Sequence, residues 1–350
     1  MELVYLIGII ALFFLLIAPH EFGHYFVAKR VGVGVKEFAI GFGPTMLKHE
    51  GKGTVYSIRA LPIGGYVRLE GLEGNFDAPD SFYRRSLWEK LAVLVAGPLM
   101  NYVVAAVSIF VILVMVSSTV PGVIFAVLQN TPAAKAGLKP GDRIVSIDSH
   151  KVVSFSKLSS MIQASNGKPI EIKYQETDGA YKIIVVRPEL IQGAYRIGIE
   201  EKIPFNLLYD VKQAVVMPIA TGAAIVGGLD ALVTGRVPGG IVGPSGLTGP
   251  IGIVAIAAQT VAAGLLPYLQ LLSFLSVSLA IVNILPIPAL DGGRILVALL
   301  EGLHGKPFDR KIEMEIQWYG LIILLAFVAI ISVFDIQRLL NGEFMGLGGR

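Results

Sequence analysis

The chain has 350 residues, of which 54% are hydrophobic and only 16% are charged, whereas soluble domains carry about 25% charged residues. It has no cysteine, which excludes disulfides and thiolate metal sites. The net charge is +3 and the basic residues are scattered without interleaved aromatic residues, so no nucleic-acid partner is expected. This composition indicates a protein whose main partner is the lipid bilayer.

Four uncharged stretches approach the roughly 20 apolar residues that a bilayer requires. The first reaches that length only if its helix continues past Ala18 to Ala28, before Lys29 and Arg30. We therefore expect a polytopic α-helical membrane protein with about four transmembrane helices. The expected spans are 3–28, 91–116, 265–290 and 316–334.

The first span ends in a pattern of ionisable residues, His20-Glu21-Phe22-Gly23-His24. Residues at i and i+4 share a helix face, so the two imidazoles can chelate one zinc ion. The adjacent Glu21 can take a proton from a water that the zinc activates. The alternative is a set of satisfied polar residues. Ionisable groups inside a span cost at least about 2.5 kcal/mol each, so metal chemistry is favoured.

Residues 118–200 differ from the spans because charge returns and short alternating segments appear. They predict an α+β domain, with strands at 123–128, 143–147, 170–174 and 181–186 and a helix at 156–164. The stretch A-A-K-A-G-L-K-P-G-D-R-I-V-S-I-D (133–148) resembles PDZ domains, which bind an extended peptide or a C-terminus by strand addition. The alternative is a folded spacer without a ligand.

Residues 201–262 form the part of the sequence that is hardest to interpret. Apolar residues from Leu207 to Ile219 share one helical face, which predicts a helix lying at the outer membrane surface. A run rich in glycine and proline follows from Val237 to Gly252. This linker is either a hinge or a shallow re-entrant segment.

Zinc needs a third protein ligand, and Asp291 is the best candidate. It is the first charged residue after an uncharged stretch that begins at Val237, and it lies at the expected cytoplasmic end of the third span. Pro286 and Pro288 break the helix there, and Gly292-Gly293 let the backbone approach closely. The alternative is that Asp291 caps the next helix, a role compatible with ligation.

Lysine and arginine residues gather in the connection between the first two spans and between the last two. The positive-inside rule places both connections in the cytoplasm and residues 118–200 outside. We therefore expect a multi-pass membrane protein with its active site near the cytoplasmic face and the inserted domain extracytoplasmic; the family resemblance given next implies that the membrane is the bacterial inner (cell) membrane.

Several motifs together resemble the site-2 protease family of intramembrane metalloproteases, with the regulator-of-sigma-E protease type as the nearest branch. The residues that carry the likeness are H-E-F-G-H (20–24), G-F-G-P (41–44), L-P-I-G-G-Y-V (61–67), A-G-P-L-M-N (96–101), Asn283-x-x-Pro286 and Leu290-Asp291-Gly292. Several relatives in that family carry two tandem PDZ domains, whereas this chain has room for one.

The resemblance implies one zinc ion held by His20, His24 and Asp291, with Glu21 as the general base. It also implies cleavage of a transmembrane helix in another protein, such as an anti-sigma factor, during regulated intramembrane proteolysis. Asn283 and Pro286 match family positions that hold the substrate.

Residues 54–70 alternate and are rich in β-branched and aromatic residues, which predicts a cytoplasmic-side, membrane-associated β-hairpin turning near Pro62 and Gly64-Gly65. A helical substrate must unwind before its peptide bonds are accessible, and an open strand edge can accept the unwound segment. Gly64 and Gly65 are therefore candidate substrate-binding residues. The alternative is a hairpin that only packs on the helices.

Two other functions fit parts of the sequence. A membrane zinc protease of the prenyl-protein or quality-control type would use a glutamate as third ligand, for which Glu301, Glu313 and Glu315 are available. A membrane-tethered PDZ adaptor would use its metal structurally.

Overall fold

The computed structural model describes residues 2–342 except 52, 73, 119, 192, 238–239, 241–242 and 244–245. The chain forms two compact units, one made of Met1–Ile109 with Ala214–Arg350 and the other of Phe110–Gln213. The second unit is thus an insert in the first, close to the expected boundaries of 118 and 200.

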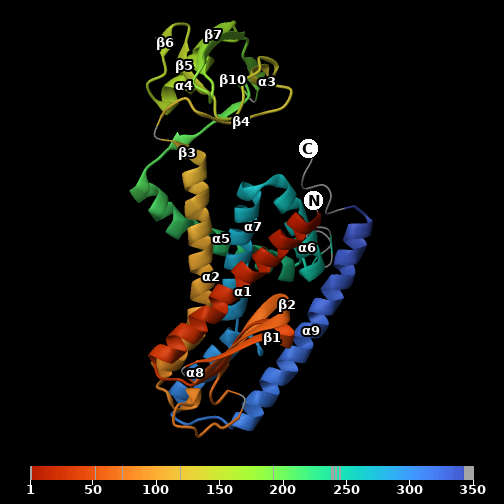
Figure 1. Cartoon of the computed structure of the whole chain (residues 1–350). Helices are drawn as coiled ribbons and strands as arrows, with labels where there is room; N and C mark the ends of the chain where they lie inside the picture. The colour runs from red at the N-terminus through yellow and green to blue at the C-terminus, as the bar shows by residue number, and fades with distance from the viewer. Residues whose placement is uncertain are drawn as a thin grey trace. The chain divides into compact units, whose positions relative to one another are not determined.

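The first unit is built mainly from long apolar helices. They are α1 (Glu2–Arg30), α2 (Leu87–Val116), α5 (Leu207–Val233), α6 (Pro250–Ala263), α7 (Leu265–Ile284), α8 (Asp291–His304) and α9 (Arg310–Leu340) (Figure 1). Within the described part of the chain, five of them, α1, α2, α5, α7 and α9, are long and apolar enough to cross a membrane. These helices support a polytopic membrane protein.

Two helices differ from the sequence prediction. The expected surface helix is α5, a single 27-residue helix with the length and composition of a span. The expected third span 265–290 ends early, because α7 stops at Ile284 and Leu285 is extended. Pro286 explains this end, since a proline disfavours helical backbone in the residue before it.

The strands β1 (Val35–Gly51) and β2 (Thr54–Leu69) form the sheet of the first unit. Each strand bends, so that residues 37–40 pair with 55–58 on one side and with 65–68 on the other. The hairpin turn joins Gly51 to Thr54, and the pairs there are antiparallel.

The predicted turn within 54–70 is therefore corrected in one respect. The chain does reverse near Gly64, whose φ of +96° suits glycine, but the two arms of β2 do not pair with each other. Residues 37–40 lie between them, which makes 55–58 a central segment. Among the residues that the structure describes, segment 65–69 pairs with no strand other than β1 and forms an edge of the sheet.

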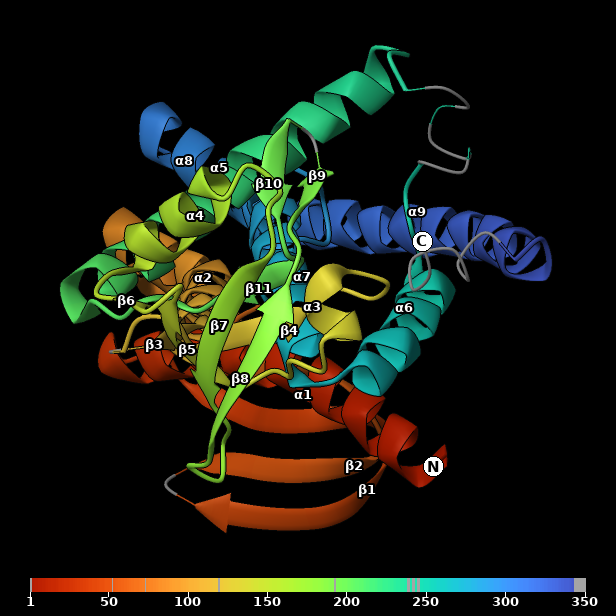
Figure 2. The same ribbon diagram turned by 90° about the horizontal axis from the view of Figure 1, so that it is seen from above.

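Packing fixes the C-terminal half of α1 between α2 and this sheet. A buried apolar cluster joins α1 to both, with Ala28, Val33, Val35, Leu69, Phe82, Val93 and Leu94 as its members. A second cluster packs the N-terminal half of α1 against α6 and α7, through Leu12, Leu16, Ala257 and Leu272. Figure 2 shows α1 lying along the sheet of β1 and β2.

The second unit is an α+β domain around a four-stranded sheet of order β6-β5-β7-β8. Its elements are β3 (Ser117–Ser118), β4 (Ile124–Val127), α3 (Pro132–Lys135), β5 (Arg143–Ile147), β6 (His150–Lys151), α4 (Phe155–Ala164), β7 (Ile170–Gln175), β8 (Tyr181–Val186), β9 (Glu189–Ile191), β10 (Ala194–Arg196), β11 (Ile199–Glu201) and β12 (Ile203–Pro204). Alternating residues of β7 (Ile170, Ile172 and Tyr174) form its core with Ile144 and Ile147 of β5 and Leu158 of α4. The predicted strands and helix are confirmed here.

Candidate metal centre

Two histidines of α1 face one aspartate at the start of α8. The Nε2 atoms of His20 and His24 lie 3.2 Å apart. Asp291 Oδ2 lies 3.4 Å from His20 Nε2 and 3.3 Å from His24 Nε2. Both histidines are less than a tenth exposed. Three ligand-type atoms thus converge at one buried point, from residues far apart in the sequence.

This donor set fits a zinc ion. In the part of the chain that the structure describes, His20, His24 and Asp291 are the only such cluster. Asp291 Oδ2 is buried, faces the Nε2 atoms of both imidazoles and accepts no hydrogen bond of ordinary geometry from the described residues. Two imidazoles and one carboxylate suit tetrahedral zinc and leave a fourth position for water.

Glu21 lies against the edge segment of β2. A Cβ atom built on Gly65 would lie 3.6 Å from Glu21 Cγ and 2.8 Å from the carbonyl oxygen of Ala39. The missing side chain at Gly65 therefore lets this edge approach both α1 and the neighbouring strand. As a result, the candidate general base and the candidate substrate-binding edge are direct neighbours.

Glycines let α2 pack directly on the two histidines. A Cβ on Gly97 would meet His24 Nε2 at 2.2 Å, and a Cβ on Gly23 would meet the backbone oxygen of Ala96 at 2.3 Å. The close approach brings the backbone oxygen of Val93 within 2.8 Å of His24 Nδ1, which donates to it. This hydrogen bond leaves Nε2 of His24 as the nitrogen available for a metal.

The turn between α7 and α8 positions Asp291. Built Cβ atoms on Gly292 and Gly293 would meet the carbonyl oxygens of Leu285 and Ile287 at 2.1 and 2.5 Å, which confirms the predicted close backbone approach. From α9, Gln317 Oε1 accepts a hydrogen bond of 2.6 Å from the backbone N–H of Ala289. The turn is therefore held from both sides.

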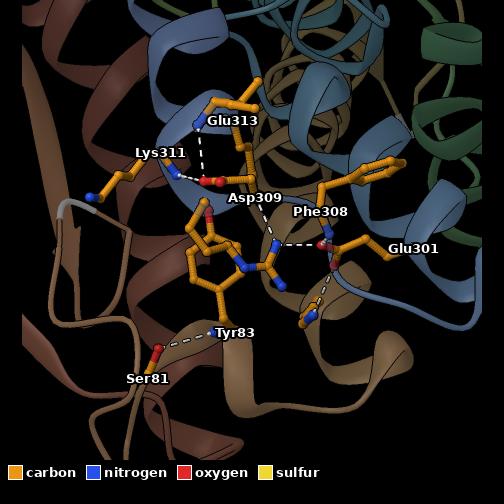
Figure 3. Close-up of polar contacts among 10 residues, drawn as sticks. Ser81, Tyr83, Glu301, Phe308, Asp309, Lys311 and Glu313 are labelled. Carbon is orange, nitrogen blue, oxygen red and sulfur yellow. Dashed lines mark hydrogen bonds and ion pairs between the residues drawn. The ribbon is translucent and has the colours of Figure 1, made fainter.

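The far end of α8 is fixed by a buried cluster of charges (Figure 3). Glu301 contacts Lys90 of α2 at 3.4 Å and forms a close ion pair with Arg310 of α9. Arg310 also pairs with Glu313 at 3.0 Å and stacks on the ring of Tyr83, 3.8 Å from its centroid. We call Lys90, Glu301, Arg310 and Glu313 the ion cluster. It ties α8 to α2 and α9.

Charge balance accounts for the ion cluster without any ligand. Its two carboxylates face two cations, and the backbone N–H of Phe308 donates a further hydrogen bond of 2.9 Å to Glu301. Burial alone would raise the pKa of the Glu301 carboxyl, but the hydrogen bond from Arg310 and the other contacts hold that pKa below its ordinary value.

The other predicted site residues lie close to Asp291 along the chain. Asn283 is in the last turn of α7, and Pro286 is in the turn that follows. Sequence reasoning missed Gln317 and the ion cluster. The available signals were a glutamine inside an apolar span and charged residues near the ends of three apolar stretches. Which partners these side chains contact depends on the tertiary fold.

Comparisons with known proteins identify the family of the chain. Peptidase family M50 matches residues 8–327. A relative from Clostridium acetobutylicum is 32% identical over 333 residues, covering 94% of this chain and 96% of the relative. A zinc metalloprotease RasP from Bacillus licheniformis is 30% identical, over 95% and 99% of the two chains. The regulator of sigma-W protease RasP from Bacillus subtilis is 29% identical, over 95% and 98%.

The alignment with the Bacillus subtilis relative spans 432 positions, more than the 350 residues of this chain, so that relative carries inserted segments. The matches confirm the predicted family, a metalloprotease activity and Zn²⁺ as cofactor. The chain belongs to peptidase family M50, the site-2 protease family of membrane metalloproteases.

Proposed function

We propose that this protein is a zinc-dependent endopeptidase that cleaves transmembrane segments of other proteins within the bilayer. The observation that carries the proposal is the convergence of His20, His24 and Asp291 between helices long enough to cross a membrane. Zn²⁺ held by these three residues would polarise the scissile carbonyl and lower the pKa of a water at the fourth position.

The chain's own residues perform the other parts of the reaction. Glu21 accepts the proton of the attacking water and later passes it to the leaving amine, so it acts first as base and then as acid. The side-chain amide of Asn283 donates to the scissile carbonyl oxygen. Pro286 shapes the turn that presents Asp291.

The edge segment 65–69 supports a substrate that binds as a strand. These residues pair with no strand other than β1 among the described residues, and the backbone of Val67 hydrogen-bonds the Glu21 side chain. A substrate helix that unwinds can pair along this edge, next to Glu21. Gly64 gives the bend and Gly65 the close approach, which assigns both a role in substrate binding.

The favoured substrate is a single-pass membrane protein of the anti-sigma-factor kind. The relative named regulator of sigma-W protease supports this class. Basic residues between α1 and α2 support an active site near the cytoplasmic face of a bacterial membrane. The insert is then extracytoplasmic. Its strand order and its A-G-L-K-P-G-D stretch support a single PDZ domain that binds a peptide end.

The other two functions lose support at particular residues. Glu301 and Glu313, candidate third ligands of a quality-control protease, are engaged by Lys90 and Arg310. In a PDZ adaptor the metal would be structural, and the carboxylate of Glu21 would have no role as a base.

The test compares the wild type with Glu21→Gln on a model transmembrane substrate in detergent, with zinc content measured on the same samples. We expect the wild type to cleave inside the apolar segment. The variant should keep its zinc and lose about 10²–10⁴-fold in cleavage rate, the usual contribution of a general base. A zinc-loaded variant that cleaves at the wild-type rate would eliminate Glu21 as the base.

A further inference from the structure

Asn101 is a completely buried polar residue inside α2, a helix long enough to cross a membrane. One end of its side-chain amide lies 3.3 Å from His20 Nδ1. The other end, Oδ1, is buried and has no hydrogen-bond partner in the described part of the chain. An unsatisfied buried amide costs free energy and is rare, so this residue requires an explanation.

The chemistry of His20 decides which end of the amide must face it. Its Nε2 points at His24 and Asp291 and is therefore the nitrogen that faces the metal position. A neutral imidazole that binds a metal through Nε2 carries its proton on Nδ1, which makes Nδ1 a donor. The partner of Nδ1 must then be an acceptor, which the NH₂ end of an amide is not.

The oxygen and nitrogen ends of an amide have nearly the same shape, so the hydrogen bonds assign them. A half-turn of the Asn101 amide exchanges its two ends: Oδ1 takes the position 3.3 Å from His20 Nδ1, and the NH₂ group takes the buried position that Oδ1 leaves. We propose that Asn101 is a positioning residue that accepts a hydrogen bond from His20 Nδ1 and thereby holds Nε2 toward the zinc.

The spacing along α2 supports this role. Val93, Gly97 and Asn101 lie at i, i+4 and i+8, on one face of the helix. The carbonyl of Val93 accepts from His24 Nδ1, Gly97 leaves room for both rings, and Asn101 faces His20. One helix face therefore supplies an acceptor to each histidine, and the two ligands are oriented as a pair.

The proposal rests on the zinc centre of the proposed function and adds a residue outside its ligand set. The test measures zinc affinity of purified full-length protein by chelator competition. Asn101→Leu keeps the size but removes the acceptor, whereas Asn101→Asp keeps an oxygen at the same place. Ser108→Ala, on the same helix with a hydroxyl bonded to its own helix at Val104, is the matched control.

We expect Asn101→Leu to bind zinc about 10–100-fold more weakly, as is usual when a partner of a metal-bound histidine is removed. Asn101→Asp and Ser108→Ala should stay within a few fold of the wild type. The absorption spectrum of the cobalt-substituted protein should change in the leucine variant alone, because it reports ligand geometry.

Two results would overturn the proposal. One is an Asn101→Leu variant that binds zinc as tightly as the wild type. The other is an Asn101→Asp variant that binds zinc as weakly as the leucine variant, because packing and not the acceptor oxygen would then determine the affinity. If Asn101→Leu does not fold, Asn101→Ala is measured in the same way. Failure of the wild type itself to bind zinc or to cleave would instead count against the proposed function.

Discussion

Two buried polar clusters in the same unit differ in how their charges are balanced. The ion cluster places two carboxylates opposite two cations, so it is complete within the protein. The cluster of His20, His24 and Asp291 brings three metal-binding groups together and leaves a carboxylate oxygen without a hydrogen bond. The ion cluster is satisfied by its own residues and maintains the fold, whereas the three metal-binding groups form the proposed ligand site.

The largest effect is expected at the unsatisfied cluster. Asp291→Ala should lose zinc and reduce cleavage to background, because two imidazoles alone hold the ion weakly. Zinc content and cleavage of a model transmembrane substrate are measured on one preparation. A fully loaded, active Asp291→Ala protein would remove the aspartate from the ligand set and weaken the contrast between the clusters.

A substitution in the ion cluster should lower the stability of the fold rather than the affinity for zinc. Arg310→Met leaves two buried carboxylates with too little positive charge, which typically costs about 3–5 kcal/mol. The midpoint of unfolding in detergent measures this. Arg236→Met removes the same kind of charge from an exposed pair with Asp230 and should change stability by no more than about 1 kcal/mol. Equal losses in both variants would contradict the structural role of the ion cluster.

A methyl group can test the packing of α2 on the histidines. Gly97→Ala places a Cβ 2.2 Å from His24 Nε2 and should weaken zinc binding by about 10–100-fold, although alanine itself favours the helix. The control Gly302→Ala meets only the flexible end of Leu87. It should leave zinc affinity unchanged, and chelator competition distinguishes the two variants.

The smallest expected effect is a change of stability at acidic pH. The pKa of Glu301 is lower in the folded protein than its ordinary value of 4.5. The ionised carboxylate therefore stabilises the fold above pH 4.5, and this contribution is lost as the pH falls through the lower pKa of the folded state. The stability gap between the wild type and Glu301→Gln should therefore be full at neutral pH and narrow below about pH 4.5. A gap independent of pH would show that packing, not charge, produces it.

The sequence predicted the parts of the molecule that depend on local patterns. The apolar runs, the strands of the insert and the close approach at Gly292-Gly293 follow from periodicity and residue size, and the structure agrees with them. The pair of His20 and His24 was readable because one helix turn separates them. Asp291 was predicted from its charge in an uncharged region, and the structure brings the three side chains together.

The remaining features depend on contacts between distant segments. The double pairing of residues 37–40 needs the bends of both β1 and β2, so a single-strand pattern could not reveal it. The partnership of Asn101 with His20 and the ion cluster around Arg310 join separate helices. The end of α7 at Ile284 is not of this kind: it agrees with the local break predicted at Pro286 and Pro288, and only the bound of 290 was too long.

The position of the insert along the chain has a consequence for assembly. Residues before it supply two imidazoles, and residues after it supply the single carboxylate, so neither part alone carries a complete ligand set. A zinc ion held by the proposed ligands would therefore be a removable cross-link between the two parts of the chain, formed only after both have folded together. Fragments produced by cutting the chain inside the insert would have to find each other before either could hold the metal.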